Sequence, residues 1–384
     1  MEVDILNIPK LRFKEFTDEW KEYPLKYFTT PIKRKNTNNE SDLPLTISSL
    51  DGLVDQRTYF NKVVASKDMS NYYLLKKGEF AYNKSYSVGF PFGSIKRLDK
   101  YNQGALSSLY ICFQVNNMNS DFIVKYFESP KWHKQISLCV AEGARNHGLL
   151  NVNINDFFST KHFLPQLVEQ EKIANFLSTV DKKIENLENT ITSLENQKKG
   201  LLQQIFSQKL RFKDEDGNNN YTSYYLYELI KDIKSGNNKE RIKTGLFPVY
   251  GSMGILGYNN NYIYDFTTIL IARVGMNAGN VSLVTGKYDV SDNTLIIIPS
   301  NKINIYYLYY YLINFNLNKL VFGSGQPLIK ASELKKIIIK IPCLEEQTKI
   351  ADFLSAFDRK LENQKAQLEH WQQIKKGLLQ QMFV

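Results

Sequence analysis

The 384-residue sequence lacks the features of a secreted or membrane protein. It has only three cysteines, Cys112, Cys139 and Cys343, and none of them belongs to a CxxC pair. Such sparse cysteine is typical of a reducing cytoplasm and argues against a disulfide framework or a zinc finger. No run of about 18 apolar residues occurs, and the N-terminus lacks an apolar signal core. We therefore predict a cytoplasmic location and no membrane contact.

Common catalytic motifs are missing as well. There is no GxxxxGK[ST] phosphate loop, no N/D-P-P-Y/F methyltransferase motif, and no proline followed by aspartate as in many nuclease sites. The four histidines show no metal-ligand spacing, and the GxxGxxG string at 251–257 lacks the order of a dinucleotide-binding loop. We predict that this chain alone is not an enzyme and holds neither metal nor cofactor.

What the sequence does contain is a long repeat. Residues 165–206 and 342–383 align without a gap at an offset of 177, and 22 of these 42 positions are identical. Both copies read P-x-L-x-E-Q-x-K-I-A-x-F-L-S and end in KKGLLQQ, and a shorter string, KLRFK, begins at Lys10 and again at Lys209. The chain is therefore a duplication in which KLRFK and the long repeat enclose a stretch that differs between the halves.

The repeated segments have the periodicity of long amphipathic helices. Their apolar residues recur at alternating spacings of four and three, as in the a/d seam of a coiled coil. The seam consists of Ile173, Leu177, Val180, Ile184, Leu187, Ile191 and Leu194 in the first copy, and of Ile350, Leu354, Phe357, Leu361, Leu368 and Trp371 in the second. Packing of each helix on its own domain is the alternative. Because the seams match, we predict that the helices pair with each other, antiparallel and with pseudo-two-fold symmetry.

Some repeated residues lie outside the seam, among them Glu169, Gln170, Asp181, Lys183 and Gln203. Exposed helix faces usually diverge after a duplication, so this retention predicts a second surface that contacts the same kind of partner twice. A recent duplication is the alternative, although the divergence of the intervening stretches disfavours it.

The excess positive charge lies in the intervening stretches. The net charge is +5 over residues 1–164, −1 over 165–206, +6 over 207–340 and 0 over 341–384. Two basic modules joined by neutral helices are the layout expected of a protein whose modules contact DNA phosphates. Short strand-like runs alternate with turn signals in both stretches, so we predict a mixed α/β (α+β) fold with globular domains at 1–164 and 209–341 and spacer helices at 165–208 and 342–384.

Polar and basic loop residues are the candidates for DNA contact. Arginine and lysine can bridge guanine acceptors, and asparagine and glutamine can bind adenine with two hydrogen bonds. The candidates are Lys33, Arg34, Lys35, Asn83, Lys84, Ser85, Tyr86, Arg97, Arg145 and Asn146 in the first stretch, and Asn238, Lys239, Arg241, Tyr250, Ser252, Arg273, Ser324 and Gln326 in the second.

The sequence resembles the specificity subunits of type I restriction–modification enzymes. The resemblance rests on the paired repeats and on the strings YLLKKGEFAYNKSYSVGFPFGSIKRLDKYNQGALSSLYICF, VYGSMGILGYNN, ILIARVGMNAGNVSLV and SGQPLIKASELKKIIIKIP. It implies two target-recognition domains that each read one half of a split site on double-stranded DNA. It also implies two methyltransferase subunits and motor–nuclease subunits as partners, with S-adenosylmethionine, ATP and Mg in those partners.

Two other functions remain open at this point. One is a detached specificity half of a fused methylase–nuclease, whose neighbouring chain carries the chemistry. The other is a coiled-coil scaffold that binds no nucleic acid.

Overall fold

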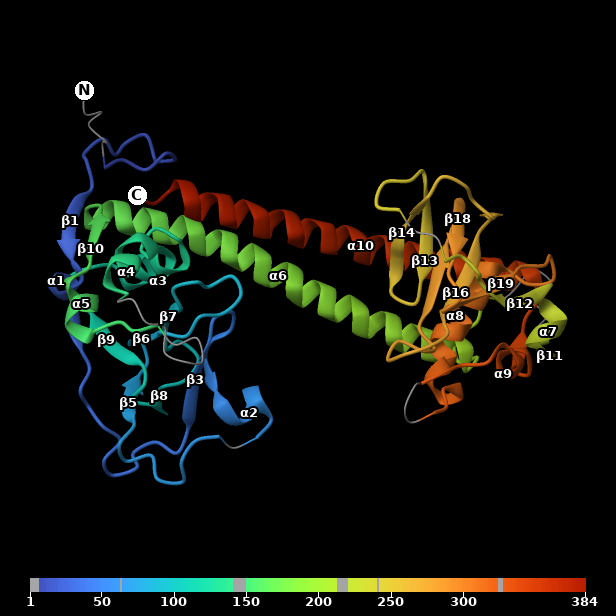
Figure 1. The fold of residues 1–384 in the computed structure, drawn as a ribbon, viewed down its shortest axis with the longest axis horizontal. Coiled ribbons are helices and arrows are strands. Elements are labelled where there is room, and N and C mark those ends of the chain that lie inside the picture. Colours follow the sequence, from blue (N-terminus) through green and yellow to red (C-terminus); the bar gives the residue numbers. More distant parts are fainter. Residues whose placement is uncertain (1–6, 63, 141–149, 213–219, 240–241, 324–326) are drawn as a thin grey trace. The chain divides into compact units, whose positions relative to one another are not determined.

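The computed structural model describes residues 7–62, 64–140, 150–212, 220–239, 242–323 and 327–384. They fall into two compact units: unit 1 comprises Met1–Asn186 and Leu368–Val384, and unit 2 comprises Leu187–Gln367. Each unit has one sheet-rich domain, and two long helices each contribute one end to each unit (Figure 1). The predicted mixture of helix and strand, with two domains and two long helices, is confirmed.

The long helices coincide with the repeated segments. Helix α6 spans Leu167–Phe206 and α10 spans Leu344–Gln381, and each begins two residues after a proline, Pro165 or Pro342. Eight of the thirteen predicted seam residues are buried, and Ile184, Phe357, Leu361, Leu368 and Trp371 are half-buried. Among the described helices, none is long and apolar enough to cross a membrane.

Within each unit the two helix ends run antiparallel. In unit 2, Lys198 contacts Asp358 at 2.5 Å, while the earlier residue Glu195 contacts the later Lys365 at 2.6 Å. In unit 1, Lys375 contacts Asp181 at 2.7 Å, and residues before Asp181 share a core with residues after Lys375. Lys375 is the repeat counterpart of Lys198, and Asp358 is the repeat counterpart of Asp181, each at the offset of 177. The same ion pair thus forms once in each unit.

The domain of unit 1 contains a two-stranded sheet and two four-stranded sheets. Strand β1 (Lys21–Pro24) pairs with β10 (Lys161–Leu164), and the larger sheets have the orders β4-β3-β8-β5 and β2-β9-β6-β7. The other elements are α1 (Leu25–Phe28), β2 (Thr29–Pro31), β3 (Pro44–Ser48), β4 (Gly52–Asp55), α2 (Gln56–Phe60), β5 (Tyr73–Lys76), β6 (Phe80–Asn83), β7 (Ser94–Arg97), β8 (Gln103–Leu106), β9 (Ile111–Val115), α3 (Ser120–Glu128), α4 (His133–Cys139) and α5 (Ile154–Ser159).

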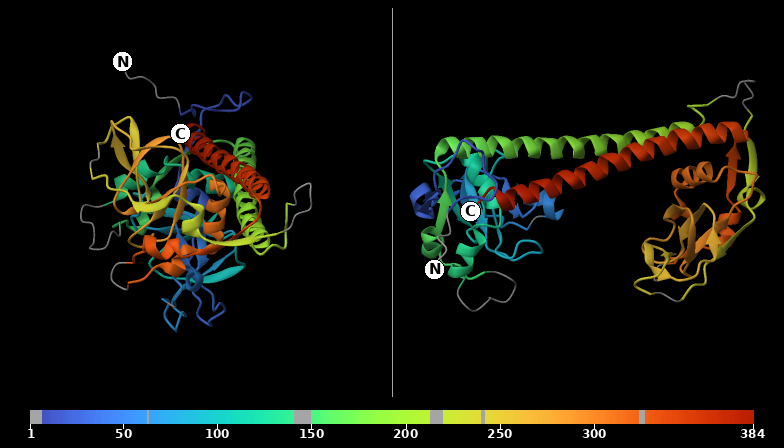
Figure 2. Two further views of the ribbon diagram at one scale, coloured as in Figure 1. Left: turned by 90° about the vertical axis from the view of Figure 1, so that its right-hand side faces the viewer. Right: turned by 90° about the horizontal axis from the view of Figure 1, so that it is seen from above.

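The domain of unit 2, with its strands in yellow and orange, is seen from two further directions in Figure 2. Strand β11 (Thr222–Tyr225) pairs with β20 (Ile338–Ile341), and the larger sheets have the orders β14-β13-β18-β15 and β12-β19-β16-β17. The other elements are α7 (Leu226–Leu229), β12 (Asp232–Ser235), β13 (Phe247–Gly251), β14 (Gly254–Asn259), β15 (Tyr264–Asp265), β16 (Thr268–Ala272), β17 (Val281–Val284), β18 (Lys287–Val290), β19 (Thr294–Ile298), α8 (Ile305–Phe315), η1 (Leu317–Leu320) and α9 (Ala331–Lys335).

The two domains have the same topology, although their sequences show little resemblance. Each strand of one domain has a counterpart at the same place in the sheet orders of the other. The one parallel pairing among the described strands of each domain is also equivalent, β3 with β8 and β13 with β18. Successive side chains of a strand point to opposite faces of the sheet, whatever the residues are. Many different sequences with apolar residues on the inner face can therefore form one topology.

A buried ion pair explains why Glu169 is repeated. Its carboxylate accepts hydrogen bonds from Arg12 Nε and Nη2 at 2.8 and 2.7 Å, and Glu346 is bound by Arg211 with both distances at 2.8 Å. These hydrogen bonds raise the pKa of both arginines. Each arginine belongs to a KLRFK string, so the short and long repeats meet in what we call the Arg–Glu clamp.

A buried amide explains the adjacent repeated glutamine. Gln170 donates to the carbonyl of Pro165 at 2.8 Å and accepts from the backbone N–H of Asn119, the N-cap of α3, at 2.9 Å. Gln347 makes the equivalent bonds to Pro342 and to Asn304, the N-cap of α8. The prediction that Glu169 and Gln170 belong to a partner surface is therefore wrong, because they and their counterparts Glu346 and Gln347 are buried within their own units.

Removing one member of the clamp is expected to destabilise the protein strongly. Glu346→Ala removes the buried carboxylate that binds Arg211 Nε and Nη2, at a cost of about 3 kcal/mol. Replacing both residues with methionine removes both charges and should cost less. The matched control is Glu345→Ala, which breaks only an exposed contact to Lys349 and should cost under about 1 kcal/mol. Urea unfolding measures all three, and equal midpoints for Glu345→Ala and Glu346→Ala would contradict a stabilising clamp.

His162 makes the stability of unit 1 depend on pH. Its ring nitrogens lie 2.8 Å from Tyr126 Oη and from Thr160 Oγ1, and burial lowers its pKa from 6.5 to about 3. Because the unfolded chain binds this proton more readily, stability is lost as the pH falls from about 6.5 toward 3, by up to about 1.4 kcal/mol per pH unit.

The repeat supplies the control, since the equivalent position in β20 is Ile339. Urea midpoints of the wild type and His162→Ile at pH 7, 6 and 5 should converge as the pH falls. Parallel pH profiles for the two proteins would show that His162 does not carry this dependence.

Candidate nucleic-acid interface

Three connections meet at one edge of the unit 1 domain. Because β3 and β8 are parallel, both end at the same edge, and because β6 is antiparallel to β9, β6 ends where β9 begins. The β3–β4, β6–β7 and β8–β9 connections therefore gather there. Ser49 Oγ lies 3.1 Å from Ser94 Oγ and 3.4 Å from Ser87 Oγ, which ties the first two connections together. We call residues 49–51, 84–93 and 107–110 the loop edge of unit 1.

The equivalent edge of unit 2 consists of residues 252–253, 273–280 and 291–293. The carbonyl of Asn293 accepts hydrogen bonds from Ser252 Oγ at 2.8 Å and from the backbone N–H of Arg273 at 3.0 Å. One carbonyl thus joins all three connections. We call these residues the loop edge of unit 2.

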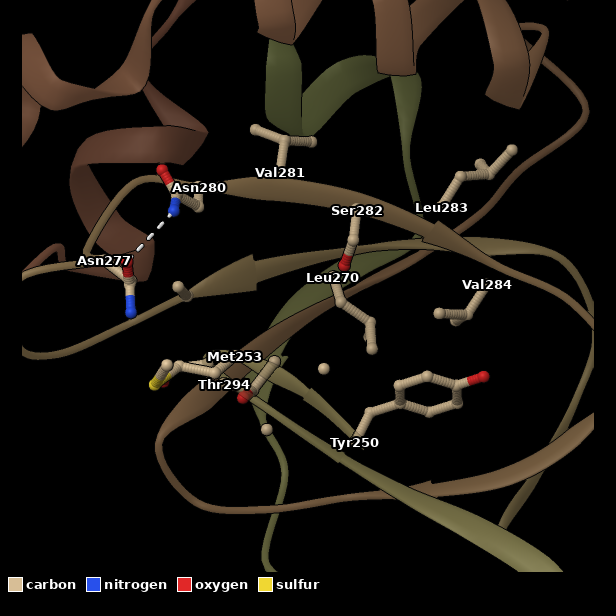
Figure 3. A pocket seen from close by; sticks show the side chains of 14 residues that line it. Tyr250, Met253, Leu270, Asn277, Asn280, Val281, Ser282, Leu283, Val284 and Thr294 are labelled. Atoms are coloured by element: carbon tan, nitrogen blue, oxygen red, sulfur yellow. Dashed lines mark hydrogen bonds between the residues drawn. The ribbon is translucent and has the colours of Figure 1, made fainter. Parts of the chain in front are cut away.

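A cavity of about 500 Å³ opens at the loop edge of unit 2 (Figure 3). Its lining includes Leu270, Val281 and Leu283 from the strands and Met253 from the β13–β14 turn. At one end two amides face each other, where Asn280 Nδ2 donates to Asn277 Oδ1 at 3.4 Å. Apolar walls with a few polar groups suit the binding of a flat or apolar group.

Glycine allows the β6–β7 connection to close. Gly93 has a φ of +75°, which disfavours other residues, and a Cβ there would lie 2.0 Å from the carbonyl oxygen of Asn83. Asn83 is the last residue of β6 and Gly93 is the last residue of the loop before β7, so the close approach fixes the width of the loop. Gly279 has a similar position in the β16–β17 loop, with a φ of +90°.

Several predicted contact residues lie on or beside these edges. Asn83, Lys84, Ser85 and Tyr86 lie at the start of the β6–β7 loop, and Lys33 follows β2, which ends beside the start of β9. In unit 2 the residues at or next to the edge are Tyr250, Ser252, Arg273, Asn238 and Lys239. Lys33, Tyr86 and Lys239 are exposed. Their contact with DNA stays a prediction.

Other predicted residues have partners inside their own domain. Arg34 binds both carboxylate oxygens of Glu79, and Lys35 lies 3.8 Å over the ring of Tyr73. Arg97 lies at the far end of β7 from the loop and pairs with two aspartates, Asp99 and Asp121. In unit 2, Asn238 is buried against Asp289, and Arg273 donates to Ser235 Oγ at 3.0 Å. These contacts favour structural roles, and sequence could not foresee them because most of the partners are distant in the chain.

Five predicted residues lie outside the described residues: Arg145, Asn146, Arg241, Ser324 and Gln326. Sequence reasoning also missed Ser49, Asn277 and Asn280. Gly275 and Gly279 could have indicated a turn here, because Asn277 lies between them and Asn280 follows directly. Within the described ranges, no three His, Cys, Asp or Glu side chains gather as a metal-binding group.

Comparison with known proteins finds one family model and several similar proteins. A family model described as the type I restriction modification DNA specificity domain matches residues 230–370. Over nearly its whole length the chain is similar to type I specificity subunits. The putative MjaX specificity subunit of Methanocaldococcus jannaschii is 23% identical over 97% of this chain and 95% of that subunit, and the MjaVIII subunit of the same organism is 24% identical over 72% and 73%. The alignment with the Escherichia coli EcoprrI specificity subunit is 30% identical but spans only 29% of this chain and 28% of that subunit.

Solved structures share the fold of this chain. The type I S subunit from M. genitalium aligns with a TM-score of 0.63 and 19% identity over 98% of this chain and 99% of that one. A chain from a study of complex assembly and conformational transition of the type I R-M system aligns with a TM-score of 0.56 and 15% identity, over 96% and 98%.

The closure of the β6–β7 loop can be tested with two glycines of the same loop. Gly89 and Gly93 both have positive φ, but a Cβ at Gly89 would meet nothing within 4 Å. Gly89→Ala therefore has only backbone strain, about 1–2 kcal/mol. Gly93→Ala adds the clash with Asn83 and should lower the melting temperature further. Equal melting temperatures would contradict the proposed closure.

Proposed function

We propose that this chain is the DNA sequence-recognition subunit of a type I restriction–modification complex, and that it is not catalytic by itself. Each domain reads one half of a bipartite site on double-stranded DNA. The observation that carries the proposal is that two domains of the same topology present loop edges of unrelated sequence. In both domains the same Arg–Glu clamp joins a KLRFK string to a repeated helix.

The loop edges support the reading of two different half-sites. The β6–β7 loop has the sequence KSYSVGFPFG, whereas the β16–β17 loop reads RVGMNAGN. Hydroxyl, amide and cationic groups in such loops match the donor and acceptor pattern of base edges. The net charges of +5 and +6 in the two stretches supply attraction to phosphates that does not depend on base sequence.

The exposed part of the helical repeat supports docking of two identical methyltransferase subunits. Once the buried Glu–Gln pairs are set aside, Lys183, Glu185 and Gln203 and their counterparts Lys360, Glu362 and Gln380 remain exposed in both copies. A surface that occurs twice suits a partner that binds twice. Methyl transfer from S-adenosylmethionine, and ATP- and Mg-dependent translocation and cleavage, then belong to the methyltransferase and motor–nuclease subunits.

Co-expression with the methyltransferase subunit, followed by methylome sequencing, tests the proposal. The expected result is one split, asymmetric motif that is methylated only when both chains are present. Gel-shift binding by the same complex should weaken steeply as salt rises from about 50 to 200 mM. Absence of both methylation and DNA binding in every subunit combination would refute the proposal.

The repeated helices are expected to set the gap between the half-sites. Seven residues inserted after both Asn189 and Ala366, which are equivalent in the repeat, keep the heptad phase and add about 10 Å. This should lengthen the gap in the methylated motif by about three base pairs. Four residues at the same two places shift the seam to another helix face and should abolish assembly. Methylation of the original motif by either variant would contradict this role.

A further inference from the structure

Both loop edges expose aliphatic side chains at their tips. In unit 1, Leu50 is 84% exposed and Val88 is 93% exposed; in unit 2, Met253 is 82% exposed and Met276 is 99% exposed. Such exposure forgoes the hydrophobic stabilisation that burial would give. An aliphatic side chain at a loop tip therefore suggests a bound state in which it is covered.

The four residues occupy equivalent places in the common topology. Leu50 and Met253 lie in the β3–β4 and β13–β14 turns, and Val88 and Met276 lie in the β6–β7 and β16–β17 loops. Their residue offsets, 203 and 188, differ from the 177 and 199 of the repeats, and the surrounding loops share no sequence pattern. Two diverged domains thus place exposed aliphatic groups at the same two tips, which points to a shared contact.

The surroundings of these tips mix polar with apolar groups, since Leu50 and Met253 each line a cavity with apolar side chains in its walls. Ser49, Ser87 and Ser94 form a hydroxyl cluster beside Leu50 and Val88, and Ser252, Asn277 and Asn280 lie beside the two methionines. Aliphatic tips interspersed with hydrogen-bonding groups suit a partner that itself alternates polar and small apolar groups.

The major-groove edges of duplex DNA have this character. Bases present donors and acceptors there, and the main apolar group is the C5 methyl of thymine. We propose that the loop tips read thymine by packing against its methyl group, Leu50 and Val88 in one half-site and Met253 and Met276 in the other. The proposal rests on the proposed function and adds an apolar readout beside the hydrogen-bonding groups.

Replacing thymine with deoxyuridine tests the contact directly, because it removes only the methyl group. The complex with its methyltransferase is titrated with duplexes of the methylated motif in which each thymine is replaced in turn. Loss of one packed methyl group should weaken binding about fourfold at a sensitive position. Met253→Ala/Met276→Ala should weaken binding to the thymine duplex by a similar or larger factor and abolish the sensitivity to deoxyuridine in one half-site only.

The protein supplies its own controls. Leu50→Ala/Val88→Ala should abolish the sensitivity in the opposite half-site and leave the first unchanged. Leu246→Ala removes a side chain that is 77% exposed at the other end of β13, and it should leave both half-sites unchanged.

The possible outcomes separate the two proposals. A wild-type complex that binds no DNA refutes the proposed function. A complex that binds its motif with no position sensitive to deoxyuridine, or variants that lose affinity equally for thymine and deoxyuridine duplexes, overturns the methyl contact alone. The second of these results indicates insertion between bases instead.

Discussion

The Arg–Glu clamp is the interaction on which the rest of each unit depends. It joins a string at the start of each half to a residue near the start of a long helix, and the neighbouring glutamine ties the same helix to the cap of α3 or α8. A buried ion pair adds little net stability, but a bidentate arginine–carboxylate pair accepts only one geometry. The clamp therefore specifies how each domain seats on its helix, and it leaves the sheets and loops free to diverge.

Divergence then extends over the sheets and loops of both domains. Both domains keep the same strand orders and an equivalent parallel strand pair, and this topology alone gathers three connections at one edge. Close glycine contacts such as Gly93 against Asn83 fix the width of a loop without fixing its side chains. A new loop sequence can therefore change the groups presented at the edge while the clamp and the sheets remain unchanged.

The candidate site was only partly predictable from sequence. Polar and basic residues near turns were identified correctly as loop residues in several cases, among them Lys84 and Ser252. Arg34 and Arg97 were proposed for the same reason, yet carboxylates from other elements engage them. Charge and loop position do not reveal such partners. Ser49 and Asn277 were missed because an isolated polar residue in a turn gives no signal until the topology places it beside another loop.

The sequence by itself determined the duplication, the two long helices and the location of the basic charge, because periodicity and repeats are local along the chain. It also predicted a partner surface from the repeated Glu169 and Gln170, and burial reversed that interpretation. Only the tertiary structure decided which repeated residues are internal, that the diverged stretches share one topology, and which turns meet at an edge. Those properties depend on strand pairing and on contacts between residues more than a hundred positions apart, such as Arg12 with Glu169, which no local pattern records.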